Sequence, residues 1–171
     1  MAMARSRGAT ALLIPDAGPL FSLAACDGLD LLAHFECAIT DVVWRETAGK
    51  ARAPTASREA RQIAEFLMRH PGIEIRETPL GKLTANAEPI RNLGELSIHG
   101  LLIDLRSESP ALNAVILFED HWFTHRMAHF PSGVTLLGTA AFLIAAEQLG
   151  LLASAEKAML DIRRRRPGVG R

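Results

Sequence analysis

The sequence predicts an α/β protein built on a mainly parallel sheet that is covered by helices on both faces. Short apolar runs alternate with segments of helical periodicity along the 171 residues. Residues 11–15 and 114–118 are unbroken apolar runs, as in strands that are buried on both sides. No internal repeat or domain boundary interrupts the pattern. We therefore expect one domain over residues 11–165, with flexible tails at residues 1–10 and 166–171.

The first half of the chain alternates two strands with helices. The predicted elements are a strand at 11–15, a helix that begins near Pro19, a short helical stretch around Leu29–Leu32, a strand at 37–40, a helix over VVWRET with Asp41 as its N-cap, and a polar loop at 49–55.

The second half repeats this alternation. The predicted elements are a helix at 56–69 that stops at His70-Pro71-Gly72, an edge strand at 73–78, a loop, a helix at 93–106, strands at 114–118 and 134–137, a helix with Thr139 as N-cap that closes at Gly150, and a helix at 153–165.

Composition indicates a cytoplasmic protein. Hydrophobic residues make up 49% of the chain, and no apolar run approaches the roughly 20 residues that a membrane span needs. The N-terminus lacks the features of a signal peptide, and the two cysteines, Cys26 and Cys37, form no CxxC pair. The 19 basic and 19 acidic residues balance, whereas nucleic-acid binders are usually basic. The block Arg163–Arg166 fits either phosphate contacts or a solvated helix end.

Two acidic residues follow predicted strands. Asp16 comes directly after the strand at 11–15, and Asp120 follows the strand at 114–118. Ligands of open α/β sheets bind at the carboxyl ends of the strands, so both carboxylates are candidate site residues. Asp16 could instead serve only as the cap of the next helix.

Two further carboxylates lie near inward helix faces. Glu95 shares the apolar stripe of its helix with Ile98 and Leu102, and it lies in the first turn, where the helix dipole favours negative charge. Glu46 follows Val42 and Val43 at helical spacing. Each glutamate alone is equally well explained as a residue at the rim or surface. Together with the two aspartates they could hold Mg²⁺ or Mn²⁺, which prefer oxygen ligands. Such a metal activates water and neutralises charge on a phosphodiester.

The order of these motifs resembles that of PIN-domain proteins, and most of all the toxin-type (VapC-like) bacterial ribonucleases and their uncharacterised relatives. The matching segments, which span residues 11–152, are LLIPDAGPLFSLA with Asp16, ITDVVWRET with Glu46, NLGELSIHGLL with Glu95, VILFEDHWF with Asp120 and Phe123, and VTLLGTAAFLIAAEQLGLL with Thr139.

The resemblance implies a three-layer α/β/α sandwich around a mainly parallel sheet of four to five strands. It implies catalysis by Asp16, Glu46, Glu95 and Asp120, with Mg²⁺ or Mn²⁺ held by Asp16, Glu95 and Asp120. The expected activity is hydrolysis of single-stranded RNA by a metal-dependent endoribonuclease. A homodimer and, for a toxin, an antitoxin protein are the expected partners.

Some residues depart from the family pattern. His99 follows Glu95 by one helical turn and could either face the metal or pack as a core histidine. Glu119 precedes Asp120 and is the alternative ligand. Trp122 and Phe123 could stack on a base or fill the core. Arg126 could contact a phosphate or a site carboxylate, and Thr139 is expected to support the site.

Other functions fit the sequence less well. The GxGxxG run of a Rossmann domain, a P-loop, a GxSxG elbow and the Asp-x-Asp of haloacid-dehalogenase-type phosphatases are all absent from the sequence. The remaining alternative is a PIN-like domain that has lost catalysis and acts as a protein- or RNA-binding partner. We favour the nuclease because an idle site gives no physical reason to keep four carboxylates together.

Overall fold

A computed structural model describes residues 11–85, 92–125 and 130–168, without the side chains of His121 and Trp122. In chain order the elements are β1 (Leu12–Pro15), α1 (Ala17–Ala25), the 3-10 helix η1 (Leu29–His34), β2 (Ala38–Thr40), α2 (Asp41–Glu46), η2 (Ala48–Lys50), α3 (Arg58–Arg69), β3 (Glu74–Arg76), α4 (Pro79–Leu83), α5 (Leu93–Glu108), β4 (Ala114–Phe118), α6 (His121–His125), β5 (Val134–Gly138), α7 (Thr139–Gln148) and α8 (Ala155–Arg165).

All the strand pairings in the described part of the chain are parallel, which confirms the predicted α/β class. The strands form a three-stranded sheet in the order β1-β4-β5 and a separate two-stranded sheet of β2 and β3. A single bridge between Leu13 and Cys37 places β2 beside β1. The prediction of one continuous sheet of four to five strands was therefore wrong, because the described strands form two sheets. The bridge to β1 is made by Cys37, the residue before β2, while all three residues of β2 pair with β3.

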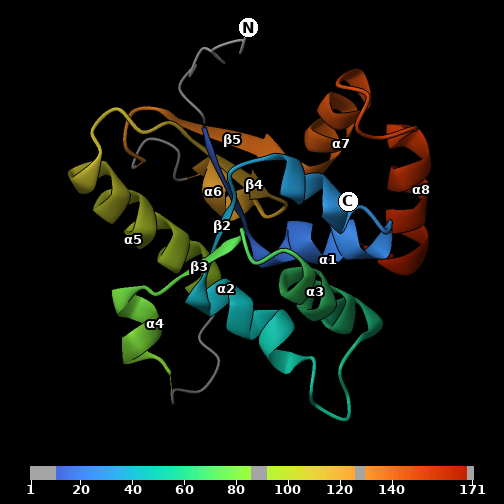
Figure 1. Ribbon diagram of the computed structural model, residues 1–171, viewed down its shortest axis with the longest axis horizontal. Coiled ribbons are helices and arrows are strands. Elements are labelled where there is room, and N and C mark those ends of the chain that lie inside the picture. The colour runs from blue at the N-terminus through green and yellow to red at the C-terminus, as the bar shows by residue number, and fades with distance from the viewer. Residues whose placement is uncertain (1–10, 86–91, 126–129, 169–171) are drawn as a thin grey trace, which may run out of the picture.

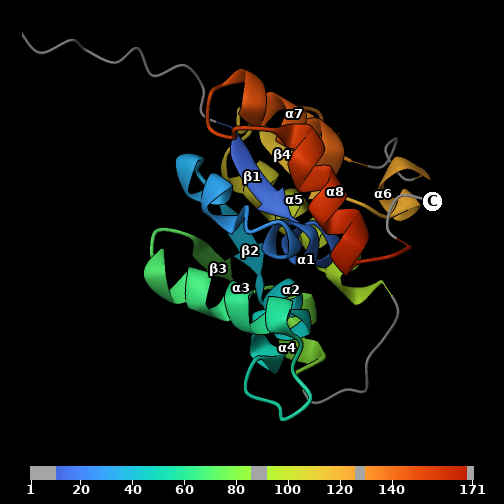
Figure 2. The same ribbon diagram turned by 90° about the vertical axis from the view of Figure 1, so that its right-hand side faces the viewer.

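The core forms where β1 and β4 lie at the centre of the molecule. Every residue of β1 is buried, and Ile116 and Leu117 of β4 are fully inaccessible to solvent. Helices pack around these strands: α7 contacts α8, α8 contacts α1, and α2 contacts α5 (Figures 1 and 2). Strands that are buried in this way need apolar side chains on both faces, which explains the unbroken apolar runs of the sequence.

Two predicted helix caps were wrong. Thr40 caps α2, because its hydroxyl accepts a hydrogen bond from the Val43 N–H at 3.2 Å. The Asp41 carboxylate instead accepts hydrogen bonds from the backbone N–H and the hydroxyl of Thr78, at 3.1 and 2.8 Å, which ties α2 to the start of α4. Gly138 occupies the cap position of α7, and Thr139 is its first helical residue.

Two short helices were missed by the sequence analysis. Helix α4 begins at Pro79 and is capped by the Thr78 hydroxyl, which accepts a hydrogen bond from the Gly81 N–H. The Thr-Pro pair is a helix-start signal that could have revealed it. Helix α6 begins two residues after Glu119 and lies in the segment whose Trp122 and Phe123 were expected to stack on a base or fill the core.

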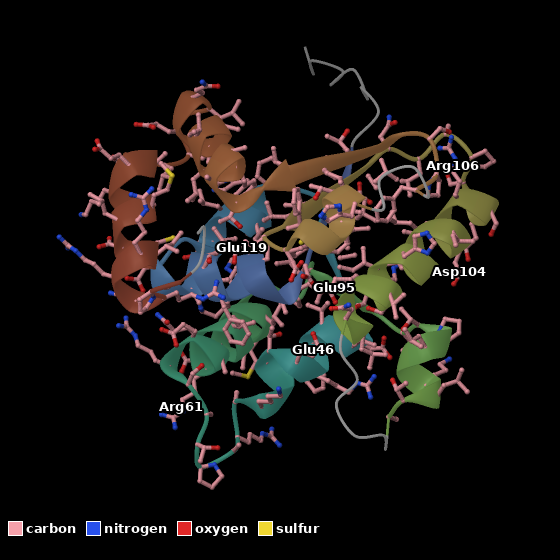
Figure 3. All side chains as sticks on the ribbon, turned by 180° about the vertical axis from the view of Figure 1, so that it is seen from behind. Glu46, Arg61, Glu95, Asp104, Arg106 and Glu119 are labelled. Atoms are coloured by element: carbon pink, nitrogen blue, oxygen red, sulfur yellow. The ribbon has the colours of Figure 1, made fainter. Side chains whose placement is uncertain are left out.

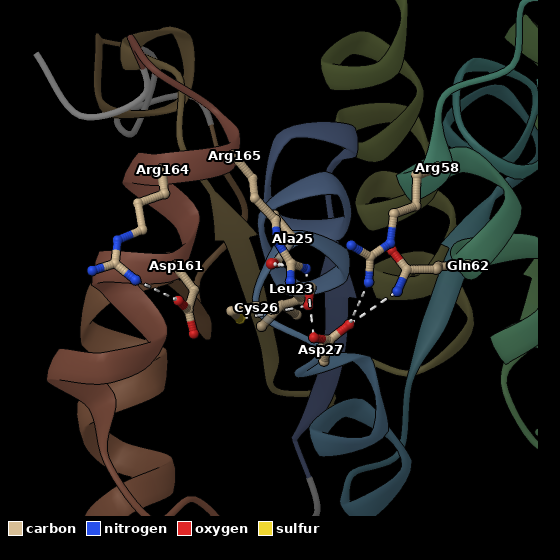
Figure 4. Close-up of polar contacts among 9 residues, drawn as sticks. All are labelled: Leu23, Ala25, Cys26, Asp27, Arg58, Gln62, Asp161, Arg164 and Arg165. Carbon is tan, nitrogen blue, oxygen red and sulfur yellow. Dashed lines mark hydrogen bonds and ion pairs between the residues drawn. The ribbon is translucent and has the colours of Figure 1, made fainter.

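The C-terminal helix is fixed to the first helix through its arginines. Arg165 donates a hydrogen bond to the Ala25 carbonyl at 2.6 Å and lies 3.5 Å from Asp27, which also pairs with Arg58 and Gln62 of α3 (Figure 4). Arg166 donates a hydrogen bond to the Gly18 carbonyl at 2.8 Å. Arg166, the first residue of the predicted C-terminal tail, is therefore held in the fold, while residues 1–10 and 169–171 lie outside the described residues. None of the helices that the structure describes combines the length and apolarity needed to span a bilayer.

Candidate functional site

The strand order reverses between β1 and β4. From β1 the chain continues to β2 and β3 on one side, and it returns to β4 and β5 on the other. Asp16 follows β1 directly, and Glu119 and Asp120 follow β4, so all three acidic residues lie at the carboxyl ends of adjacent strands. In open α/β sheets this switch point is where ligands bind.

Asp16 is the deepest carboxylate of this region, with 6% of its surface exposed. Its backbone N–H donates to the Leu117 carbonyl at 3.0 Å, which extends the pairing of β1 with β4. Although Asp16 occupies the cap position of α1, its side chain forms no capping hydrogen bond among the described residues. Helix capping therefore does not account for this buried carboxylate.

Burial raises the pKa of Asp16 from its ordinary value of 3.8 to about 7. After burial, the largest contribution is the charge of Glu95; Glu46 and Asp120 also raise the pKa, while the backbone N–H of Ala17 lowers it. Four carboxylates from different parts of the chain, which we call the carboxylate cluster (Asp16, Glu46, Glu95 and Asp120), thus lie close enough to act on one another.

The two glutamates of the cluster come from neighbouring helices. Glu46 ends α2, Glu95 lies in the first turn of α5, and both are half-buried. They lie near one another close to the centre of Figure 3. Burial raises the pKa of Glu46, and the charge of Glu95 raises it further. Burial also raises the pKa of Glu95, to which the charge of Asp120 adds.

Gly94 leaves the space between two members of the cluster open. A Cβ atom added to it would lie 2.8 Å from Oε2 of Glu46 and 3.2 Å from Oδ1 of Asp16. The absence of a side chain at this position therefore lets α5 approach both carboxylates. In the sequence the Gly-Glu pair indicates only the glutamate, and the role of the glycine follows from this packing.

A buried hydroxyl pair fixes the start of α5 against β2. The hydroxyls of Thr40 and Ser97 are 2.7 Å apart, and Ser97 donates to the Gly94 carbonyl at 2.6 Å. Both side chains are fully buried. Thr40 also caps α2, so one hydroxyl helps to orient the two helices that carry Glu46 and Glu95. A serine on the apolar stripe of α5 was the sequence signal for this contact.

The structure separates Glu119 from the cluster. Oε1 of Glu119 accepts a hydrogen bond from the Thr139 hydroxyl at 2.8 Å, and Oε2 is 3.1 Å from Nη1 of Arg166. Arg166 also donates to the buried hydroxyl of Ser22. Asp120 is exposed and acts electrostatically on Asp16 and Glu95. Thr139 therefore contacts Glu119, while Asp120 belongs to the carboxylate cluster.

Two other predicted residues, His99 and Phe123, pack against aromatic rings. The ring of His99 packs against that of Phe130, with centroids 5.3 Å apart. Phe123 is fully buried between Phe118 and Phe130, as expected of a core residue. Arg126 and the side chain of Trp122 lie outside the described residues.

A closed metal cage is absent from the described part of the chain. No three side chains of histidine, cysteine, aspartate or glutamate there are positioned together as ligands of one ion. The cluster is instead an open set of mutually repelling carboxylates. Two of them come from the ends of β1 and β4, and two come from α2 and α5.

Gly94→Ala is expected to disturb the cluster without unfolding the protein. The added methyl group must displace the flexible end of Glu46, so we expect binding of Mn²⁺ to weaken by about tenfold. Gly100→Ala on the same helix is the matched control, because its added Cβ meets nothing within 4 Å. It should raise stability by roughly 0.5–1 kcal/mol and leave Mn²⁺ binding unchanged. Calorimetric titration would measure both, and equal Mn²⁺ affinities in the two variants would contradict the role of Gly94.

Comparison of the chain with protein-family models, with curated proteins and with solved structures found no match. The function therefore has to be inferred from the carboxylate cluster and its surroundings.

Proposed function

We propose that the protein is a divalent-metal-dependent endoribonuclease that hydrolyses phosphodiester bonds of single-stranded RNA. The observation that carries this proposal is the carboxylate cluster at the switch point between β1 and β4. Its members come from four separate elements or strand ends, and they raise the pKa of Asp16 through their charges. Burying a carboxylate beside other carboxylates costs free energy unless a cation offsets their charge.

The donor set fits Mg²⁺ or Mn²⁺. All four side chains offer carboxylate oxygens, the ligands that hard divalent cations prefer. Mg²⁺ keeps several waters and binds through one or two carboxylates, so an open cluster without a closed cage is compatible with it. Asp16, Glu95 and Asp120 are the proposed ligands; because they are not positioned together around one point in the described structure, they would have to close around the ion, with Glu46 beside them. When bound, such an ion activates water and offsets charge on the scissile phosphate.

The burial of the four carboxylates differs in a way that suits a substrate entering from solvent. Asp16 is buried, Glu46 and Glu95 are half-buried, and Asp120 is exposed. A phosphodiester would therefore approach from the side of Asp120. The burial of Asp16 strengthens electrostatic interactions around it.

The wider proposal includes the PIN-like fold and its biological setting. The strand order, with β2 and β3 on one side of β1 and β4 and β5 on the other, supports a three-layer α/β/α arrangement around parallel strands. We extend the proposal to a homodimeric toxin that an antitoxin protein inhibits.

The test is cleavage of labelled single-stranded RNA with Mg²⁺ or Mn²⁺, repeated in EDTA. Cleavage is expected only with the metal, and Glu95→Gln should remove it. Asp104→Asn is a matched control, because Asp104 is an exposed acid on the same helix, far from Glu95 (Figure 3). If the protein neither cuts RNA nor binds Mn²⁺ in calorimetry, the proposal fails in favour of an inactive binding module.

A further inference from the structure

A pocket lies between the carboxyl ends of β4 and β5 and helices α7 and α8. Its volume is about 320 Å³, within the range of small-molecule sites. The residues that matter for its chemistry are Phe118, Glu119, Thr139, Leu143, Ile162 and Arg163. Most of this surface is apolar, with a few polar groups from Glu119, Thr139 and Arg163. Binding sites for flat organic groups commonly combine these two features.

The pocket is connected to the cluster through residues that neighbour two of its members in sequence. Glu119 directly precedes Asp120 of the cluster. A Cβ atom added to Gly18, two residues after Asp16, would lie 3.0 Å from Oε2 of Glu119. A group in the pocket could therefore belong to the same polynucleotide as a phosphate at the cluster.

The Glu119 carboxylate is held in place and still has acceptor capacity. Its side chain is 16% exposed, and that of its partner Arg166 is 23% exposed. Thr139 donates to Oε1 and Arg166 donates to Oε2. An ionised carboxylate offers about four acceptor positions, so these two bonds leave about two open. The two donors thereby fix the orientation in which the open positions are presented.

We propose that this pocket binds a guanine base of the RNA, with its Watson–Crick edge on Glu119. Guanine presents two neighbouring donors on that edge, N1–H and the N2 amino group, which a carboxylate can accept together. Adenine and cytosine present one donor beside an acceptor, and uracil places its donor between two acceptors. An acceptor facing the carboxylate is repelled, so the same group rejects the other bases.

The rest of the pocket suits the remainder of a nucleotide. Phe118 offers a ring and Leu143 and Ile162 offer apolar surface to the base, on which stacking is favourable. Arg163, exposed at the α8 side, offers a cation to a phosphate. Specific recognition of single-stranded RNA commonly combines stacking with hydrogen bonds to the Watson–Crick edge.

The guanine site would select RNA for cleavage, so this inference rests on the proposed nuclease function. Its test measures nucleotide binding and needs no cleavage. GMP, AMP, CMP and UMP are titrated into the wild-type protein in EDTA, with binding followed by calorimetry. GMP is expected to bind about tenfold more tightly than the other three nucleotides. Glu119→Gln should remove this preference, while Glu108→Gln on exposed α5 surface should keep it.

A second pair of variants separates blocking of the pocket from damage to the fold. Ala140 lines the pocket from α7 and is exposed, so Ala140→Trp should block GMP binding while the thermal unfolding temperature stays near that of the wild type. Ala141→Trp, at the next exposed position, is the control and should bind GMP normally.

The possible results distinguish the two proposals. Equal affinity for all four nucleotides, or GMP binding that survives both Glu119→Gln and Ala140→Trp, would overturn the guanine site. A GMP preference in a protein that does not cut RNA would uphold the guanine site and reject the nuclease. Metal-dependent cutting without any preference for GMP would do the opposite.

Discussion

Asp16→Asn is expected to reduce metal-dependent RNA cleavage by at least about 100-fold. Loss of a residue that only orients a metal ligand already costs about 10–100-fold, and Asp16 would be a direct ligand. It is also the most buried member of the cluster, so a neighbouring side chain cannot easily take its place. The asparagine amide keeps the size of the side chain and can donate hydrogen bonds to the nearby glutamates. The fold should therefore remain intact.

The measurement is single-turnover cleavage of labelled RNA at saturating Mn²⁺, with Mn²⁺ binding measured in parallel. Asp30→Asn is a suitable control, because Asp30 is exposed and makes surface contacts with Arg69 and His70. Undiminished cleavage by the Asp16 variant would remove the carboxylate cluster as the catalytic site.

The metal-free protein is expected to lose stability as the pH rises from about 4 to above 7. Asp16 has a pKa of about 7 in the folded protein against an ordinary value of 3.8, so the folded state binds more protons than the unfolded chain in this window. The free energy of unfolding must then fall as the pH increases. For Asp16 alone the loss is on the order of 4 kcal/mol above pH 7. The raised pKa values of Glu46 and Glu95 act in the same direction.

Urea unfolding in EDTA at about pH 5 and pH 8 would measure this loss, with Asp16→Asn as the comparison. The variant should be more stable than the wild type at the higher pH and show a smaller difference between the two conditions. Saturating Mn²⁺ should restore the wild type at the higher pH, by about 2.7 kcal/mol at 100 times its dissociation constant. A wild type that is equally stable at both pH values in EDTA would contradict the raised pKa of Asp16 and the burial and repulsion that cause it.

The two predictions share one physical cause, the burial of the Asp16 carboxylate among other carboxylates. A charge arrangement that destabilises the protein alone becomes favourable when a cation binds, so stability and function oppose each other at this position. Activity and unfolding measured on the same variant would therefore change in opposite directions.

The sequence by itself determined the elements in which local pattern and burial agree. The unbroken apolar runs at β1 and β4 predicted central strands, and the acidic residues after them predicted Asp16 and Asp120 at the same sheet edge. Parallel strands align their carboxyl ends, so both residues were expected at one edge of the sheet, and the pairing of β1 with β4 makes them neighbours there. The helical periodicity of α3 and α5 was equally clear because an amphipathic stripe is a local property.

Only the tertiary structure decided which polar groups meet. Glu46 and Glu95 join the cluster because α2 packs against α5, and Gly94 leaves room for them. Glu119 is bound by Thr139 and Arg166, residues 20 and 47 positions away. Asp41 bonds Thr78 instead of capping α2, and β2 pairs with β3 while meeting β1 at one bridge. Periodicity shows which side chains of one element face the core. Contacts between distant segments depend on how the elements pack, and the sequence of one segment alone does not determine that packing.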